Sequence, residues 1–149
     1  NKKEDIWIAV MGCIADHYLP EFFDEFAENY PEYWGKVEKP FDAYYGTEIG
    51  KIARSLSFGL KDSISNVVRF QNHLISCKGP GDVLAEVPGN TIFRQKYQEL
   101  QKKLDSLLSE AEKVISGKLL FFIYGGETSM SADLSNQLKY RNPGIYIYL

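Results

Sequence analysis

The sequence predicts a helix-rich α/β protein whose carboxyl end is a strand–helix–strand unit. Apolar residues recur at helical spacing through most of the first 116 residues. An uninterrupted apolar and aromatic run of strand length follows at 119–124, and a second such run lies at 145–149. A helical period over 131–140 separates the two runs, and this order of elements within about thirty residues is typical of two parallel strands joined by a crossover helix.

The first helix is predicted over 5–18, with Asp5 as its N-cap and Pro20 closing it. The apolar face of this helix is formed by Ile6, Ala9, Val10 and Cys13. The next segment, 21–34, is acidic and aromatic-rich and is interrupted by Pro31, and we expect its aromatic rings to pack inward. The stretch 36–45 contains Pro40 and no helical period, so it is predicted to be a loop.

Two amphipathic helices are predicted next, over 47–59 and 63–77. The apolar face of the first is formed by Ile49, Ile52, Ala53 and Leu56. The apolar face of the second is formed by Ile64, Val67, Val68, Leu74 and Ile75. A turn at 78–81 precedes a short helical piece that starts at Asp82 and ends near 88–90.

The longest predicted element is a helix over 91–116, in which apolar residues recur at spacings of three and four over about six turns. These residues are Phe93, Tyr97, Leu100, Leu104, Leu107, Ala111 and Val114. One apolar stripe on so long a helix indicates a connector across a domain or a short coiled coil. Gly117 is predicted to end this helix, and a second domain is predicted to begin near that residue.

The run 145–149 is typical of a buried strand with further strands beside it. Chains seldom stop inside such a strand, so we expect the sequence to be a piece of a longer protein. We also expect the exposed edge of this strand to make the isolated chain prone to pairing with other chains.

Composition excludes several classes of protein. The chain has 149 residues, of which 44% are hydrophobic and 25% charged, a balance that argues against a disordered or collagen-like protein. No stretch approaches the roughly 20 apolar residues that a membrane helix needs, and the first residues do not resemble a signal peptide. Cys13 and Cys77 are too few for a disulfide framework and suit a reducing compartment, so a cytoplasmic location is expected.

Charge is distributed unevenly along the chain. The net charge of −3 gives no global basic field for nucleic acid, but residues 1–40 carry a net −5 and residues 51–78 a net +4. The basic side chains of the second region are Lys51, Arg54, Lys61, Arg69 and Lys78. Two interpretations stay open, because this region either contacts phosphates or forms the solvated faces of amphipathic helices.

Few residues fall into patterns that carry chemistry. His17 and His73 lie far apart in the sequence and belong to no recognisable metal pair. The segment 125–129, Gly-Gly-Glu-Thr-Ser, lacks the lysine of a phosphate-binding loop. It is either an anion site at the start of a helix or a plain strand-to-helix turn.

Asp16 is the residue that stands out. It follows an apolar helix, where burial of a carboxylate is costly unless a cation pairs with it. Gly12 and Ala15 keep the helix slim nearby, so that an ion or another backbone can approach. The pattern by itself leaves two interpretations of Asp16, a capping or surface aspartate and a metal ligand.

The run 12–20, Gly-Cys-Ile-Ala-Asp-His-Tyr-Leu-Pro, resembles a motif of the DHH phosphoesterase family, above all of its RecJ-like branch. In that family a helix of small residues ends in Gly-x-x-Ala-Asp, and the aspartate binds a catalytic manganese or magnesium ion. The resemblance therefore implies that Asp16 is a metal ligand. Segment 49–61 is similar to the helical region that follows in archaeal-type members.

The resemblance also implies an architecture. Residues 1–20 would be the end of a DHH-type α/β domain, 21–90 a helical linker region and 91–116 a connector helix. Residues 117–149 would be the first βαβ unit of a DHH-associated substrate-binding domain, and the helix that contains 132–136 is similar to one of that domain.

The activity that the resemblance implies is hydrolysis of phosphodiester bonds in single-stranded or short nucleic acid. Two Mn²⁺ or Mg²⁺ ions would lower the pKa of a bridging water and neutralise the phosphate oxygens. Arg54 and Arg69 are predicted to bind the nucleic acid substrate. Replication or repair proteins are expected among the partners. Binding to a membrane is not expected.

The sequence departs from the family at two places. The Asp-x-Asp pair and the Asp-His-His triplet are absent, and so is a later glycine-rich signature that contains histidine. We expect the missing metal ligands before Asn1 and the glycine signature after Leu149, so the 149-residue chain is expected to be inactive by itself. No other catalytic residue is identified.

Other functions stay open beside a RecJ-like nuclease. Relatives in the same superfamily hydrolyse polyphosphate or cyclic dinucleotides. A catalytically inactive relative would act as a scaffold in a replication complex. A helical interaction module without a relation to this family would use the long helix as its partner surface.

Overall fold

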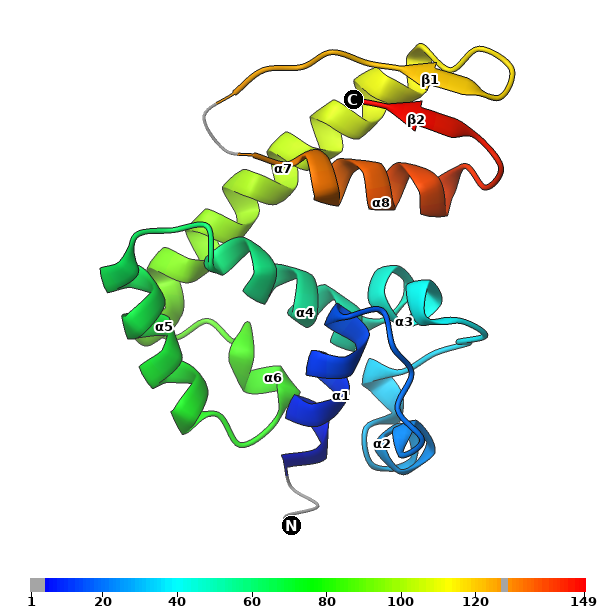
Figure 1. Ribbon diagram of the computed structural model, residues 1–149. Coiled ribbons are helices and arrows are strands. Elements are labelled where there is room, and N and C mark those ends of the chain that lie inside the picture. The colour runs from blue at the N-terminus through cyan, green and yellow to red at the C-terminus, as the bar shows by residue number, and fades with distance from the viewer. Residues whose placement is uncertain (1–4, 127–128) are drawn as a thin grey trace. The chain divides into compact units, whose positions relative to one another are not determined.

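A computed structural model describes residues 5–126 and 129–149 (Figure 1). The described residues are mostly helical and include two short parallel strands, as expected for a helix-rich chain with a little sheet. The chain divides into two compact units, one that extends to Tyr97 and one that begins at Gln98. The division falls inside the longest helix, and the finer DHH-type architecture stays a prediction.

The first unit is built from short helices joined by tight turns. Its elements are α1 (Ile6–Ala15), α2 (Phe23–Asn29), the 3₁₀ turn η2 (Pro31–Tyr33), α3 (Pro40–Gly46), α4 (Glu48–Gly59), α5 (Ile64–Ser76), α6 (Pro80–Val83), the 3₁₀ turn η3 (Pro88–Asn90) and the first two turns of α7 (Thr91–Lys113). Helix α1 packs against α2, α3 and α4, so it lies at the centre of this unit (Figure 1).

The face that α1 buries differs from the predicted one. Its buried side chains are Ile6, Trp7, Val10, Met11 and Ile14. Ala9 is exposed and Cys13 half-buried, so the prediction that these two residues face the core was wrong. The physical reason is that α1 is apolar on every side, and in such a helix only the neighbouring helices select the buried face.

Residues 36–45 contain a helix where a loop was predicted, because α3 begins at Pro40. Proline at the first helical position costs nothing, since its fixed φ suits the helix and its missing N–H would be unpaired there. The Asp42 carboxylate accepts hydrogen bonds from the backbone N–H groups of Lys39 and Glu38, at 3.0 and 3.2 Å. These local signals outweigh the absence of a long helical period.

Helix α4 follows α3 almost directly and packs closely against it. The Thr47 hydroxyl accepts a hydrogen bond from the Gly50 N–H at 3.0 Å and donates to the Ala43 carbonyl. A Cβ at Gly50 would collide with the backbone carbonyls of Ala43 and Tyr44, so only glycine allows this approach. The predicted face of α4 is confirmed at Ile49, Ile52 and Ala53, while Leu56 is half-buried.

The predicted apolar face of α5 was wrong at Ile64, Val68 and Ile75, whereas Val67 and Leu74 are half-buried and Leu74 packs against the core. Phe70 is the side chain of α5 that is fully buried, and its ring stacks on Phe93 of α7 with centroids 3.5 Å apart. Ile64 and Ile75 are each 83% exposed, and Val68 is 48% exposed. The aromatic stack turns the side of α5 that carries Phe70 and Leu74 toward the core, and the side that carries Ile64, Val68 and Ile75 is left in water.

The second unit contains the rest of α7, strand β1 (Leu119–Phe121), helix α8 (Ser131–Arg141) and strand β2 (Tyr146–Tyr148). The long helix is confirmed, and its buried side chains in this unit are Leu100, Leu104, Leu108 and Ala111. It ends at Lys113, before Val114, which is 48% exposed. Gly117, at φ +58°, lies in the following turn, where Ser116 and Leu119 exchange backbone hydrogen bonds.

The parallel pair that the strand–helix–strand order predicts is confirmed. Leu119 pairs with Tyr146 and Phe121 with Tyr148. The first strand is shorter than the predicted 119–124, because its described partner strand ends at Tyr148 and the Phe122 N–H bonds to that residue's carbonyl at 3.0 Å. The expectation of a buried final strand was wrong, since Tyr146 is 68% exposed.

One face of this small sheet is bare. Leu120 is fully buried, whereas its neighbours on the other face are exposed. The exposed set on that face is Leu119, Phe121, Ile123, Tyr146 and Tyr148. Parallel strands are normally covered on both faces.

Among the described helices, none is both long enough and apolar enough to cross a membrane.

The bare sheet face generates a prediction about self-association. We expect the purified chain to form dimers or larger species as its concentration rises, because association removes large apolar side chains from water. Phe121→Glu places a charge at the centre of the face and is expected to keep the chain monomeric. Light scattering coupled to size-exclusion chromatography measures the mass.

The matched control is Ile75→Glu, which places the same charge on an exposed aliphatic residue of α5. It is expected to leave self-association unchanged. A wild-type chain that stays monomeric at high concentration contradicts the prediction.

Candidate functional site

The carboxyl end of α1 is the first candidate site, and its backbone conformation is unusual. Helix α1 ends in a Schellman motif, in which the Tyr18 N–H bonds to the Cys13 carbonyl at 2.9 Å and the His17 N–H to the Ile14 carbonyl at 3.0 Å. His17 has a φ of +55°, in the left-handed region that glycine normally fills at this position. Strained positions of this kind cluster at functional sites.

Asp16 directly follows α1 as its C-cap residue and is exposed. The Schellman turn carries its side chain to the surface, which agrees with the interpretation as a capping or surface aspartate and leaves the carboxylate accessible to a cation. No basic residue lies in the last turn of α1, and no described residue forms an ion pair with Asp16. The negative end of the helix dipole and the carboxylate thus add up to a local field that favours a cation.

The surface of α1 beside Asp16 is open. Gly12 lies one turn before Asp16 on the same side of the helix, and a Cβ built there would meet no atom within 4 Å. Alanine would stabilise a helix at such a position by about 1 kcal/mol, so glycine is not explained by packing within the described residues. The structure fits the prediction that Gly12 leaves room for an approaching ion or backbone.

The ring of His17 packs into the first unit beside Asp16. It lies 4.4 Å from the ring centroid of Phe41 and 5.1 Å from that of Tyr44. Its Nε2 atom is buried and has no hydrogen-bond partner among the described residues. These contacts hold the ring in place, while the Schellman hydrogen bonds fix the left-handed backbone.

Arg54 approaches the same region from α4. Its guanidinium donates a hydrogen bond to the Tyr44 carbonyl and lies 5.7 and 5.6 Å from the ring centroids of Tyr44 and Tyr45. Burial lowers the pKa of Arg54, and the nearby tyrosines, Tyr97 first, oppose that effect. Tyr44 therefore connects Arg54 to His17 and so to Asp16, and this position favours a structural role for Arg54.

The described residues include no group of three or more histidine, cysteine, aspartate or glutamate side chains that could hold a metal ion. Asp16 would thus supply one oxygen ligand, of the kind that Mn²⁺ and Mg²⁺ accept, and not a complete centre. The role of Asp16 as a metal ligand stays a prediction.

Arg69 lies away from this site, on the exposed side of α5. It lines an open groove of about 330 Å³ together with Asn72, His73, Ser76, Pro88, Gly89 and Ile92. The two arginines predicted to bind substrate are therefore on different helices, and Arg54 contacts Tyr44, which in turn contacts the ring of His17 beside Asp16. Substrate binding by either arginine stays a prediction.

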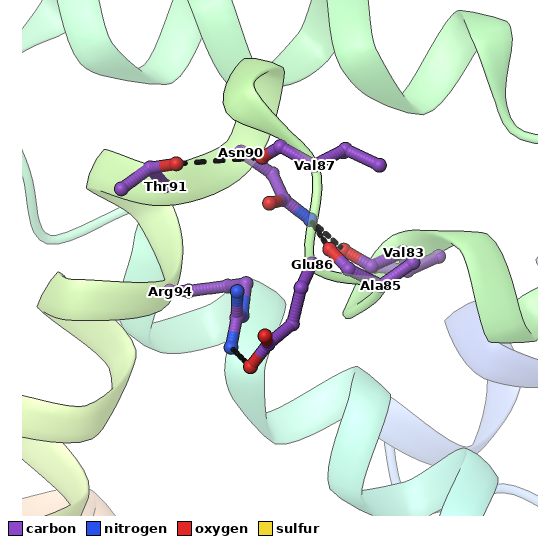
Figure 2. A network of polar contacts seen from close by, with 7 residues as sticks. All are labelled: Val83, Ala85, Glu86, Val87, Asn90, Thr91 and Arg94. Atoms are coloured by element: carbon purple, nitrogen blue, oxygen red, sulfur yellow. Dashed lines mark hydrogen bonds and ion pairs between the residues drawn. The ribbon is translucent and has the colours of Figure 1, made fainter.

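A polar network at the start of α7 holds η3 in place (Figure 2), and Pro88 and Gly89 of η3 line this groove. The Asn90 amide donates to the carbonyls of Val83 and Ala85 at 3.0 and 2.8 Å, and Arg94 forms an ion pair with Glu86. Asn90 is 1% exposed, and the network ties η3 to the segment after α6.

A cysteine–histidine contact at the end of α5 was not anticipated from the sequence. Cys77 directly follows the helix, and its Sγ lies 3.7 Å from the His73 Nε2. Burial raises the pKa of the Cys77 thiol, and the carboxylate of Asp82 raises it further. Because the thiolate is the nucleophile, this environment opposes cysteine catalysis.

The glycine-rich segment after β1 lines a second cavity, of about 540 Å³. Its lining includes Gly125, Gly126, Ser129 and Ser131, and the Ser131 hydroxyl lies 2.6 Å from that of Tyr124. Residues 127 and 128 of the predicted anion loop lie outside the described residues. Both interpretations of this loop, an anion site and a plain turn, therefore stay open.

Backbone strain at His17 can be tested with two substitutions. We expect His17→Gly to be more stable than His17→Ala by about 1 kcal/mol, because both remove the ring and only glycine relieves the left-handed strain. The free energies of unfolding in urea give the difference.

The same pair at Gln71, an exposed position inside α5, is the control. There alanine is expected to be the more stable by a similar amount. Equal stability of the two His17 variants would remove the argument for strain.

The chain matches no protein-family model, no curated protein sequence and no solved structure. The assignment of a function therefore depends on the residues and on their geometry.

Proposed function

We propose that this chain is part of a metal-dependent phosphoesterase similar to the DHH family, in which Asp16 binds a Mn²⁺ or Mg²⁺ ion. The substrate that we propose is single-stranded or short nucleic acid. The observation that carries the proposal is the exposed Asp16 carboxylate at the negative end of α1, with no base in the last helical turn.

Two neighbours of Asp16 support a cation site. A carboxylate at a helix carboxyl end is unfavourable by a few tenths to about 1 kcal/mol unless a cation is present. Gly12 leaves the adjacent helix surface open, and His17 holds a strained backbone beside it. Gly12 within the helix, the carboxylate of Asp16 at its end and the left-handed backbone of His17 each lower stability. Three such features within six residues are more readily explained by function than by stability.

The residues of the site have separate roles in this proposal. Asp16 holds the cation from the end of a rigid helix. His17 sets the direction of the chain after Asp16, and its ring is held by Phe41 and Tyr44. Arg54 fixes Tyr44 from α4. A divalent ion bound here would polarise a phosphate oxygen and activate water.

The retained carboxylate favours an enzyme over the alternative of an inactive scaffold, since a scaffold does not need a metal ligand. Hydrolysis of polyphosphate or of cyclic dinucleotides would use the same cation chemistry. The observations at Asp16 therefore support the metal site more directly than they support any one of these substrates.

A manganese titration of the 149-residue chain tests Asp16 directly. Mn²⁺ broadens the NMR signals of nearby amides even when it binds weakly, so a single ligand is sufficient for detection. We expect amides of residues 12–18 to broaden first. Asp16→Asn keeps the size of the side chain, removes its charge and is expected to abolish this local effect.

The acidic segment 21–32 supplies the control, because it offers competing carboxylates. Asp24→Asn, at an exposed position of α2, is expected to leave broadening at 12–18 unchanged. Broadening that is centred on 21–32 and does not respond to Asp16→Asn would refute a cation site at the end of α1.

We further expect the purified chain to cleave no oligonucleotide in the presence of Mn²⁺. The reason is that a two-metal reaction needs several ligands around each ion, and Asp16 supplies one. Gel analysis of labelled single strands measures this. Metal-dependent cleavage that disappears in Asp16→Ala would show that the chain holds a complete centre.

A further inference from the structure

Helix α5 exposes a stripe of aliphatic side chains. Ile64 and Ile75 are 83% exposed and Val68 is 48% exposed. Their spacing of four and seven residues places the three side chains on one face of the helix. Leu60, just before α5, is 67% exposed. Contiguous apolar surface of this kind on a helix marks interaction sites more often than scattered single residues do.

The helix that carries this stripe has a basic residue and no acidic one, because Arg69 lies within α5 and the nearest acids lie outside it. No acidic residue occurs between Asp62 and Asp82, whereas Arg69 and Lys78 are exposed there. The carboxylate of Asp62 accepts hydrogen bonds from the Ser63 N–H and the Asn66 amide, and that of Asp82 accepts from the Lys78 N–H. Both neighbouring acids are thus engaged in local hydrogen bonds, and Arg69 forms no ion pair with a described residue.

A row of polar side chains lies beside the stripe. Arg69, Asn72 and Ser76 follow one another at spacings of three and four along α5 and face the open groove next to η3. The groove is lined by no carboxylate, and Ile92 adds an apolar contact at its far side. An incoming acidic side chain would therefore meet a guanidinium, an amide and a hydroxyl.

We propose that α5 is a docking surface for an acidic amphipathic helix of a partner protein. Apolar residues of the partner would pack on Ile64, Val68 and Ile75. Carboxylates on the flank of that helix would enter the groove and pair with Arg69. The choice of an acidic partner rests on charge complementarity with Arg69, which lines a groove that contains no carboxylate.

Two other occupants fit the observations less well. Single-stranded nucleic acid is bound by aromatic stacking and by several cations, and the exposed side of α5 holds aliphatic residues and one arginine. A second copy of α5 would bring Arg69 toward its own counterpart, because the same patch meets itself in a symmetric dimer.

The probe for this surface is a synthetic helical peptide of about five turns, with leucine on one face and glutamate elsewhere. Fluorescence anisotropy with the 149-residue chain measures its binding. We expect Ile64→Ser, Ile75→Ser and Arg69→Glu each to weaken binding by about tenfold or more, as anchors of such interfaces do. These positions are exposed, so circular dichroism is expected to show an unchanged fold.

Matched controls distinguish binding at α5 from non-specific binding of the peptide. Ile8→Ser removes an exposed aliphatic side chain from α1, and Lys36→Glu reverses an exposed charge elsewhere. Neither is expected to change binding by more than about twofold. A peptide with lysine in place of glutamate is expected not to bind.

Several results would overturn the proposal. They are no binding at millimolar peptide, equal binding of the lysine peptide, or no response to the three α5 variants. Tighter binding of an oligothymidylate that is lost in Arg69→Glu would assign this face to nucleic acid instead. The outcome is independent of the metal site, because none of these variants alters the end of α1.

Discussion

Helix α1 is apolar on all sides, and the cost of leaving it in water draws α2, α3 and α4 around it. Trp7, Val10 and Ile14 of this helix are almost completely buried. The close approach of α3 and α4 at Gly50 and the position of Tyr44 follow from this packing. The end of α1 is thereby held rigidly, with Asp16 at the surface.

The same packing brings Arg54 close to the candidate site. The guanidinium contacts Tyr44, and Tyr44 in turn contacts the ring of His17. A substitution at Arg54 would thus reach Asp16 through two side chains, without any contact between Arg54 and a substrate. The two arginines selected from charge have different environments, because Arg54 is enclosed by tyrosines and Arg69 is exposed on α5.

The proposed phosphoesterase and the proposed docking surface use separate parts of the first unit. Asp16 follows α1, and the aliphatic stripe and Arg69 lie on α5. A cation site needs a fixed carboxylate, whereas a docking face needs exposed apolar area with complementary charge. The distribution of charge along the chain serves both, since residues 1–40 carry a net −5 and residues 51–78 a net +4.

The sequence by itself determined the long helix, the helix pair over 47–77 and the parallel strands, because hydrophobic period and crossover order are local properties. Asp16 was also identified from sequence, as the one acid that ends an apolar helix. Only the tertiary structure decided which face each helix buries. Ala9 and Ile75 were predicted to be inside and are exposed, since neighbouring helices and the Phe70–Phe93 stack select the buried side. The left-handed backbone of His17 closes the Schellman turn after α1, whereas the rings of Phe41 and Tyr44 that pack against its side chain are brought there by the tertiary structure.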